Sequence, residues 1–392
     1  MGVRKVTVLA SIVVLGLSLA PAAQALPPLT WEKTAGRELN DVATDPEGNV
    51  YVTGFRWDRG RDRTVMIVRS FASDGSVRWK RSWVPPDIDG LPTSTVGREI
   101  DVAGGVVVVG GQVARWICNA EGWWLRTYTT DGELLWQRQQ RGWRRCAIAS
   151  WTEAVTTDGR SILLGWNELK GEPYVRGHLR TYDLDGTVRW NSAFEVPRFG
   201  DVMDGVRDAT ITGPGRVYVA GWTRDRPDRD PTGRYHLVVQ KFSPSGSLLW
   251  TRRPGPPSRA LASADTIDAR GGSLLVGATI GRLSGHIAWL GSLTVIGRVD
   301  WIREWPARGW ETSVALASKG SSYVIHGVRS GGDGGADARI RHVGPGGDVL
   351  STGRLDRGPV DVEMTSIAAM KHGFVVAASV EPPVGGYVAR FG

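Results

Sequence analysis

Long apolar runs and linkers are scarce in this chain of 392 residues. After residue 20, no stretch approaches the roughly 18 to 20 apolar residues that span a bilayer, so we expect a soluble mature protein without a membrane span. No Pro/Ser-rich linker divides the sequence, which favours a single domain. The formal charge of +8 rests mainly on arginine, since only seven lysines are present, and it is spread along the chain. Because no basic stripe carries interleaved aromatics, we predict no nucleic-acid partner.

Catalytic motifs are missing as well. The sequence has no Gly-x-Ser-x-Gly element and no His/Asp/Glu cluster with the spacing of metal ligands. The six histidines are scattered, and His178, His236 and His286 fall on or near expected strands, which favours structural roles. The glycine-rich run from Gly331 to Gly335 has no following Lys-Ser/Thr pair, so we expect a loop there rather than a phosphate cradle.

The first 25 residues are typical of a secretory signal peptide. Arg4 and Lys5 precede an apolar run from Val6 to Ala20, and Ala23-Gln24-Ala25 supplies the small residues of a cleavage site. We therefore expect cleavage after Ala25 and a mature domain of residues 26–392 in the extracellular space or the periplasm.

Only two cysteines are present, Cys118 and Cys146. An even number in an exported chain favours a disulfide over a metal-binding or nucleophilic role. The strand pattern described below places both cysteines in connections on the same face of the domain. Closing this loop would stabilise the fold by roughly 3 to 4 kcal/mol in the chain-entropy model.

A six-residue strand pattern recurs along the chain at intervals of 50 to 56 residues. The seven copies are Asn49–Gly54, Gly105–Gly110, Arg160–Gly165, Arg216–Gly221, Gly272–Gly277, Ser322–Gly327 and Gly373–Ala378. A fixed period in this range is typical of a β-propeller or another repeat array.

Each repeat predicts four antiparallel strands, A to D. In the first repeat they are expected at Asp41–Asp45, Val50–Phe55, Thr64–Phe71 and Val77–Lys80, with turn residues between A and B and between C and D. The seventh repeat ends after strand C, whereas Leu29–Lys33 resembles a strand D that precedes the first repeat. We therefore predict an all-β, seven-bladed β-propeller of four-stranded blades, closed by pairing of the N-terminal strand in the last blade.

Tryptophan recurs four residues after the glycine of the C–D turn. The pairs are Gly75/Trp79, Gly132/Trp136, Gly186/Trp190, Gly246/Trp250 and Gly297/Trp301, with Trp31 expected in the closing strand; a sixth turn at Gly346 is followed by Leu350. An aromatic residue precedes four of these turns, at Phe71, Tyr128, Tyr182 and Phe242, whereas Leu293 and His342 take that position in the fifth and sixth units. We expect these rings to fill the wedges between neighbouring blades rather than to stack on a ligand.

The segment from Asp41 to Gly54, DVATDPEGNVYVTG, closely resembles the repeat of secreted bacterial β-propellers, whose signature is D-x-x-G-N-x-Y-V-T-G. The Gly-x-x-x-Trp spacing is similar to the tryptophan-docking repeat of quinoprotein-type propellers. Both resemblances imply the propeller fold and a binding or enzymatic role. The full tryptophan-docking motif is D-x-x-T-G-x-x-x-W, and this chain lacks its Thr in every repeat. It also lacks the vicinal cysteine pair of quinone-dependent alcohol dehydrogenases, and both departures argue against a quinone cofactor.

Carboxylates recur near the start of strand A, which lines the central channel of a propeller. They are Asp41, Glu99, Glu153, Asp208 and Asp265, with Ser313 and Thr365 in the remaining units. Five acids at one mouth would raise one another's pKa or recruit a cation such as calcium. The alternative is that each acid caps backbone amides or pairs with an arginine of the next blade.

These patterns favour a non-enzymatic binding module over an enzyme. We expect a monomer that binds a protein or glycan partner through the face formed by the B–C and D–A loops, where tryptophans such as Trp57, Trp166 and Trp222 lie in or beside the connections. No cofactor is predicted, with calcium as the metal that the acids would take. The rival is a polysaccharide lyase or hydrolase, or less favourably a quinone-dependent dehydrogenase, with its site at the channel mouth and acids such as Asp41 or Glu153 as acid and base.

Overall fold

The computed structural model describes 18 segments of the chain. They are residues 26–35, 38–86, 92–115, 121–140, 148–170, 175–195, 203–213, 215–225, 233–256, 258, 261–270, 272–282, 285–307, 312–316, 321–329, 336–355, 362–380 and 385–392. Within these segments the secondary structure is entirely strand and turn, and no helix of a length and apolarity that would cross a membrane occurs there. The proposed signal peptide, Cys118 and Cys146 lie outside the described residues, so the cleavage site and the disulfide stay predictions.

The strands group into units that follow the sequence period. Unit 1 holds β2 (Glu38–Thr44), β3 (Val50–Asp58), β4 (Arg63–Phe71) and β5 (Val77–Trp83). Unit 2 holds β6 (Thr93–Ala103), β7 (Val106–Arg115), β8 (Glu121–Thr129) and β9 (Leu134–Gln139). Unit 3 holds β10 (Ile148–Thr157), β11 (Ser161–Lys170), β12 (Val175–Asp183) and β13 (Val188–Phe194), and unit 4 holds β14 (Met203–Thr212), β15 (Arg216–Arg224), β16 (Tyr235–Phe242) and β17 (Leu248–Arg252).

The later units have the same form. Unit 5 holds β18 (Ala262–Arg270), β19 (Ser273–Arg282), β20 (Gly285–Thr294) and β21 (Val299–Ala307), and unit 6 holds β22 (Thr312–Leu316), β23 (Ser322–Arg329), β24 (Ala336–Val343) and β25 (Val349–Leu355). Unit 7 holds β26 (Val362–Ala369), β27 (Phe374–Val380), β28 (Tyr387–Phe391) and the N-terminal β1 (Leu29–Thr34).

Consecutive strands of a unit pair antiparallel, giving five four-stranded sheets and one eight-stranded sheet. The larger sheet forms because a single parallel bridge, Arg176 with Asp204, links units 3 and 4. β1 pairs antiparallel with β28, with Thr34 opposite Tyr387. The chain therefore forms multiple four-stranded antiparallel sheets of the kind that the repeat pattern predicts.

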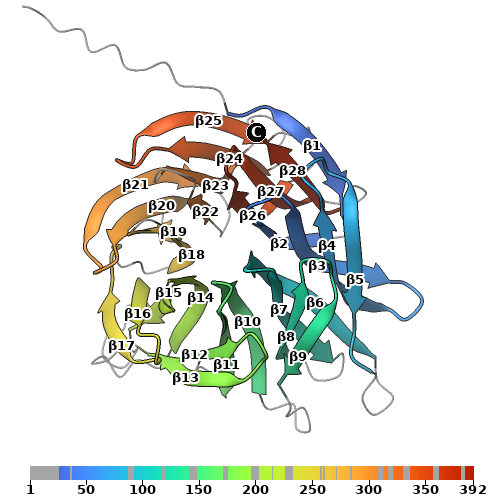
Figure 1. Ribbon diagram of the computed structural model, residues 1–392. Coiled ribbons are helices and arrows are strands. Elements are labelled where there is room, and N and C mark those ends of the chain that lie inside the picture. The colour runs from blue at the N-terminus through green and yellow to red at the C-terminus, as the bar shows by residue number, and fades with distance from the viewer. Residues whose placement is uncertain are drawn as a thin grey trace, which may run out of the picture.

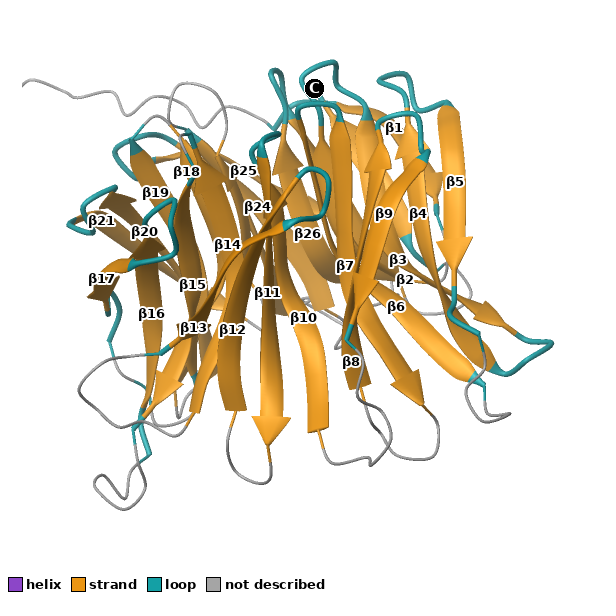
Figure 2. Ribbon diagram, turned by 60° about the horizontal axis from the view of Figure 1, so that its bottom comes forward, coloured by secondary structure: helices purple, strands orange, loops and turns teal. Residues whose placement is uncertain are grey.

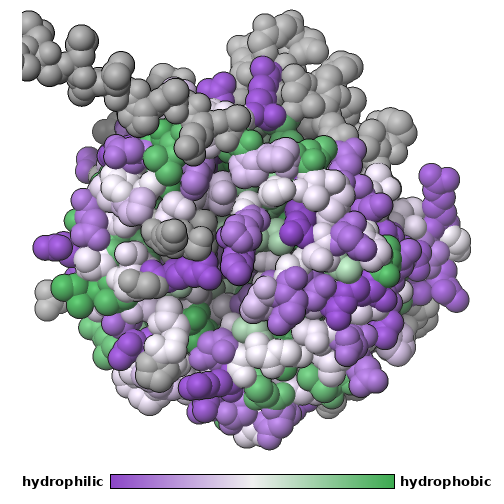
Figure 3. Space-filling model, turned by 45° about the horizontal axis from the view of Figure 1, so that its top comes forward, coloured by the Kyte–Doolittle hydropathy of each residue, from purple (hydrophilic) through white to green (hydrophobic). Residues whose placement is uncertain are grey.

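The first strands of the units surround a common axis (Figure 1). These inner strands are β2, β6, β10, β14, β18, β22 and β26; each contacts the next in chain order, and β26 contacts β2. Figure 2 shows most of the described turns at one end of the strands, which we call the turn face. The exposed aliphatic side chains lie mainly on the outermost strands, for example Val77, Leu135 and Leu249, and Figure 3 shows hydrophobic patches scattered among hydrophilic side chains.

The recurring tryptophans join neighbouring units, as the sequence predicts. The indole N–H groups of Trp31, Trp79, Trp136, Trp190 and Trp301 donate to a carbonyl in the C–D turn of the following unit over 2.6 to 3.1 Å. Each of these rings covers the turn glycine, so a Cβ on Gly132 would lie 2.7 Å from the Trp79 ring. Four of these indoles also pack on the buried aromatic of the next unit, for example Trp79 on Tyr128 at 6.2 Å between ring centroids, whereas Trp301 packs against the aliphatic cluster that contains Val343. An interblade packing role is confirmed for these five tryptophans.

The assignment of the sixth turn was wrong by one residue. Gly347, not Gly346, adopts the positive φ of the other turn glycines, at 85°. Ser351 therefore takes the tryptophan position instead of Leu350, and the buried Val343 takes the aromatic position instead of His342. Two adjacent glycines made the sequence ambiguous, because either could supply the left-handed conformation that the turn requires.

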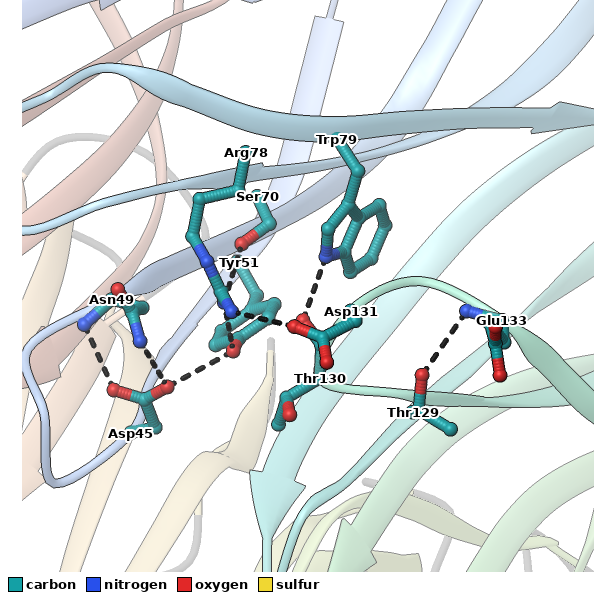
Figure 4. A network of polar contacts seen from close by, with 10 residues as sticks. All are labelled: Asp45, Asn49, Tyr51, Ser70, Arg78, Trp79, Thr129, Thr130, Asp131 and Glu133. Atoms are coloured by element: carbon teal, nitrogen blue, oxygen red, sulfur yellow. Dashed lines mark hydrogen bonds and ion pairs between the residues drawn. The ribbon is translucent and has the colours of Figure 1, made fainter.

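The motif that resembles the secreted propeller repeat locks the first A–B turn (Figure 4). The Asp45 carboxylate, expected in strand A, instead accepts hydrogen bonds from the backbone and side chain of Asn49, both at 2.8 Å, and from the Tyr51 hydroxyl at 2.9 Å. Arg78 donates to Tyr51 and to Asp131 of unit 2, over 2.8 and 3.0 Å. Burial, with the neighbouring Asp45, raises the pKa of Tyr51 to about 12. The network is a structural brace on the turn face.

Candidate functional site: the central channel

A cavity of about 1030 Å³ lies along the axis and is lined by all seven inner strands. All five carboxylates predicted from the sequence line it: Asp41, Glu99, Glu153, Asp208 and Asp265. Three further acids, Glu38, Asp101 and Asp268, and three arginines, Arg98, Arg207 and Arg270, complete its charged lining. The charged side chains come from units 1 to 5, whereas unit 6 contributes Val314 and Ala315 and unit 7 contributes Ser366, Ile367, Ala368 and Ala369.

A one-residue register shift in the inner strands determines which side chains enter the channel. Six of them skip a residue when pairing with the second strand of their unit, at Asn40, Arg98, Glu153, Arg207, Asp265 and Thr365. Such a bulge places two residues opposite one and re-aims a side chain. Consecutive residues such as Arg98 and Glu99, or Arg207 and Asp208, therefore both line the cavity.

The bulge divides the predicted acids into two sets. Asp41, Glu99 and Asp208 directly follow the skipped residue, whereas Glu153 and Asp265 are the skipped residue itself. The five acids are thus not equivalent, although the repeat period aligns them within one position.

Two of the predicted acids hold neighbouring inner strands together. The Asp41 carboxylate accepts hydrogen bonds from the backbone N–H of Val42 and from that of Ile100 in β6, at 2.7 and 2.8 Å. Asp208 repeats this pattern with Ala209 and with Ile267 in β18, both at 2.7 Å. The sequence alternative, in which these acids cap backbone amides, therefore describes both residues.

An acid outside the predicted set has the same role. The Asp101 carboxylate accepts hydrogen bonds from the hydroxyl of Thr156 and the backbone N–H of Thr157 in β10, both at 2.8 Å.

Burial, rather than mutual repulsion, is the main cause of the raised pKa values in the channel. It raises the pKa of Asp41 to about 6 and that of Asp208 to about 7, in each case against the hydrogen bonds that the carboxylate accepts. It also raises the pKa of Asp101. The repulsion expected from the sequence contributes as well, since neighbouring acids raise the pKa of Asp41, Glu99 and Asp208, but the largest effect is the loss of water around each carboxyl group.

Glu99 differs from these bracing acids. Burial raises its pKa well above the usual range, and the charges of Asp41, Asp208 and Glu153 add to the rise while Arg98 opposes it. Among the residues that the structure describes, no hydrogen-bond donor reaches its carboxyl group. Glu99 therefore presents a carboxyl group to the cavity that no brace uses.

Glu153 has the opposite surroundings. Its carboxylate accepts hydrogen bonds from the Trp151 indole N–H and from the Asn167 side-chain amide, the latter at 3.3 Å. It also pairs with the Arg207 guanidinium at 3.5 Å. Arg98, the residue before Glu99, donates through Nε to the Gln112 side chain at 2.8 Å.

Sequence reasoning missed several polar or aromatic lining residues, among them Trp151, Arg98, Arg207 and Gln112. Strict strand alternation turns Arg98 and Arg207 away when Glu99 and Asp208 face the channel, so only the bulge brings them in. Trp151 lies two residues before Glu153, and this spacing was the signal that could have placed it on the same face.

Two further expectations from the sequence concern a metal ion and the histidines. In the described segments, no group of three or more His, Cys, Asp or Glu side chains is arranged to hold a metal ion. His178 pairs with Glu168 at 3.0 Å and His236 with Asp225 at 2.8 Å. Neither histidine lines the channel cavity.

Comparisons with known proteins show the fold and no family. No protein-family model matches the chain, and no curated protein matches its sequence. Among solved structures, it is similar to the β-propeller domain of the trilobed protease from Pyrococcus furiosus, with 9% identity, a TM-score of 0.51 and coverage of 91% of this chain and 94% of that one. Acylaminoacyl peptidase from Pyrococcus horikoshii gives 9% identity, a TM-score of 0.52 and coverage of 92% and 52%.

The chain is also similar to Trypanosoma rangeli sialidase, with 11% identity, a TM-score of 0.50 and coverage of 92% of this chain and 59% of that one. The chain thus spans little more than half the length of the sialidase and the peptidase. At these identities the likeness shows the β-propeller fold alone.

Proposed function

We propose that the protein is a secreted, monomeric binding module, a seven-bladed β-propeller that takes a neutral glycan into its central channel from the face of the B–C and D–A loops. The seven-unit strand grouping, the cyclic contacts of the inner strands and the pairing of β1 with β28 support the blade count and the closure. Export after cleavage near Ala25 is part of this proposal. It predicts that the native protein has no free thiol at Cys118 and Cys146.

The observation that carries the proposal is the mixture of side chains on the cavity wall. Trp151 supplies an aromatic ring, Arg98 and Arg207 supply donors, and Glu153 and Asp265 supply acceptors. Sugars present both hydroxyl donors and acceptors on their edges and C–H groups on their faces. Aromatic rings and convergent polar groups in a concave site match these two properties.

The protonation of the channel favours an uncharged ligand over a cation. With a pKa of about 7 for Asp208, about 6 for Asp41 and a raised value for Glu99, part of the acidic lining is neutral near pH 7. A channel in this state attracts a cation less strongly than its formal charge implies. We propose that no cofactor is needed and that calcium, the metal which the acids would take, competes poorly with a glycan.

Isothermal titration of the mature chain with cellohexaose, xylohexaose and mannohexaose tests this function. We expect at least one to bind, and Trp151→Ala to weaken that binding by roughly tenfold or more through loss of stacking. Trp151→Phe is the matched control, since both variants lose the indole hydrogen bond to Glu153 but only Phe keeps a ring. We expect Trp151→Phe to stay within about threefold of the wild type.

Three outcomes would contradict the proposal. One is binding of chitosan hexasaccharide, polygalacturonate or calcium in place of all three neutral sugars. Another is equal binding by the two Trp151 variants, since the ring would then play no part. The third is capture of a protein partner by a chain that binds no sugar, which would favour the protein alternative raised by the sequence.

A further inference from the structure

The channel contains two glutamates in opposite surroundings on neighbouring inner strands. Glu99, on β6, has no hydrogen-bond donor among the described residues and faces the charges of Asp41, Asp208 and Glu153. Glu153, on β10, is held by the Trp151 indole, the Asn167 amide and the Arg207 guanidinium. Both line the same cavity, and β6 and β10 are in contact.

These surroundings suit two different protonation states. A carboxyl group without donors, surrounded mainly by acids, is stabilised in its protonated form, because ionisation would place one more negative charge beside the charges of those acids. A carboxylate that accepts two hydrogen bonds and an ion pair is stabilised as an acceptor. Carboxyl pairs with divergent environments divide the roles of acid and base between them.

We propose that the channel hydrolyses a glycosidic bond of the glycan it binds, with Glu99 as general acid and Glu153 as general base. This inference rests on the glycan binding proposed above. Acetal hydrolysis is the reaction that a protonated and an ionised carboxyl group can catalyse together without a metal or an organic cofactor.

The reaction balances with water as the only co-reactant. Glu99 transfers its proton to the glycosidic oxygen while the bond between this oxygen and the anomeric carbon breaks. Glu153 removes a proton from a water molecule whose oxygen forms the new bond to the anomeric carbon. One water is consumed, a reducing end and a free hydroxyl form, and exchange with solvent returns both glutamates to their starting states. No atom changes oxidation state, because the anomeric carbon exchanges one C–O bond for another.

The other carboxyl groups are less suited to these roles. Asp41 and Asp208 each accept a backbone hydrogen bond from the next unit, so proton transfer would compete with a contact that joins two strands. Asp265 accepts a hydrogen bond from Thr279 at 2.6 Å and belongs to unit 5, away from the Glu99 and Glu153 strands. The enzyme alternative from the sequence named Asp41 or Glu153 as acid and base, and here Glu99 takes the role of the acid in place of Asp41.

The test measures new reducing ends and binding on the same samples. With the hexasaccharide that binds best among cellohexaose, xylohexaose and mannohexaose, we expect the wild type to release shorter sugars. Glu99→Gln and Glu153→Gln should each lower the rate by roughly 100-fold or more, the scale of general acid–base catalysis. Binding by Glu99→Gln should stay within about fivefold, since glutamine keeps the size of the side chain. Asp185→Asn, in an exposed turn, is the control and should retain the wild-type rate.

The outcomes separate this inference from the proposed function. A wild type that binds the hexasaccharide but forms no reducing ends overturns hydrolysis and leaves the binding function intact, whereas a wild type that does neither overturns both. Unchanged turnover by Glu99→Gln also overturns the assignment. If a variant fails to fold, the wild-type pH profile decides: two essential ionisations give a bell-shaped rate, and a rate that is flat from pH 4 to pH 9 refutes the pair.

Discussion

Asp208 should make the stability of this protein depend on pH in a direction opposite to that of an ordinary salt-bridged acid. Its pKa is raised from 3.8 to about 7, chiefly by burial. The folded state therefore holds a proton that the unfolded chain releases. The stabilisation linked to this proton is complete below pH 3.8 and is lost as the pH rises through 7.

The magnitude follows from the shift. One pKa unit corresponds to about 1.36 kcal/mol, so Asp208 accounts for at most roughly 4 kcal/mol over the full range and roughly 3 kcal/mol between pH 5 and pH 9. Asp208→Asn has no titrating group at this position. We expect the free energy of unfolding of the wild type, minus that of Asp208→Asn, to fall by roughly 3 kcal/mol from pH 5 to pH 9.

Urea denaturation at five pH values measures this difference. The absolute stability of Asp208→Asn is not the readout, because its amide cannot accept the hydrogen bonds of both Ala209 and Ile267. Asp185→Asn removes an equal charge from an exposed turn, where hydrogen bonds from Thr187 lower the pKa of Asp185. The control difference should not fall over this range. A wild-type minus Asp208→Asn difference that stays constant within about 0.5 kcal/mol would refute the assignment of a raised pKa to Asp208.

Two further predictions concern the joints between units. Trp79→Phe loses the indole hydrogen bond to Thr130, whereas the Trp250 indole N–H has no hydrogen-bond partner among the described residues. In urea denaturation we expect Trp79→Phe to be about 1 kcal/mol less stable than Trp250→Phe, and equal stabilities would show that the hydrogen bond contributes nothing. Gly132 and Gly105 both have positive φ, but only a Cβ at Gly132 meets a ring. Thermal denaturation should thus show Gly105→Ala losing about 1 kcal/mol and Gly132→Ala at least about 2 kcal/mol; an equal loss would show that backbone strain alone determines the effect.

The sequence predicted the repeating strands because their signals are local. A short run of apolar residues marks the second strand of each unit, and Asp-Gly turns such as Asp74-Gly75 mark the hairpin between the third and fourth strands of the first three units. The spacing from the turn glycine to the tryptophan also predicted the packing between units, since an equivalent indole contacts an equivalent turn in five places. Where two glycines stood together, at Gly346 and Gly347, the local signal failed by one residue.

The channel was predicted less completely, because its chemistry depends on a bulge that leaves no mark in the repeat period. An extra residue in the inner strand changes which side chain faces the axis, and no spacing rule distinguishes Arg98 from Glu99 as the one directed inward. Part of the arginine excess has a structural use, since Arg81 and Arg303 donate to the turn glycine carbonyls of Gly132 and Gly347 over 2.7 and 2.8 Å.

The bulge also explains how one inner strand can both form hydrogen bonds to the next unit and direct other side chains into the cavity. An inner strand with strict alternation would offer every second side chain to the axis, so each acid that bonds the next unit would remove a ligand-facing position. Placing two consecutive side chains inward separates the tasks: Asp208 bonds β18 of the next unit, while Arg207, one residue earlier, pairs with Glu153 on β10 of the preceding unit. Unit 2 uses the same pair of positions differently, because Glu99 takes the place of the bracing aspartate and the brace moves to Asp101. Because of this exchange, the Glu99 carboxyl group forms no hydrogen bond to the described residues of the next unit. For this reason Glu99, among the acids that follow a bulge, is the one that we propose as the general acid.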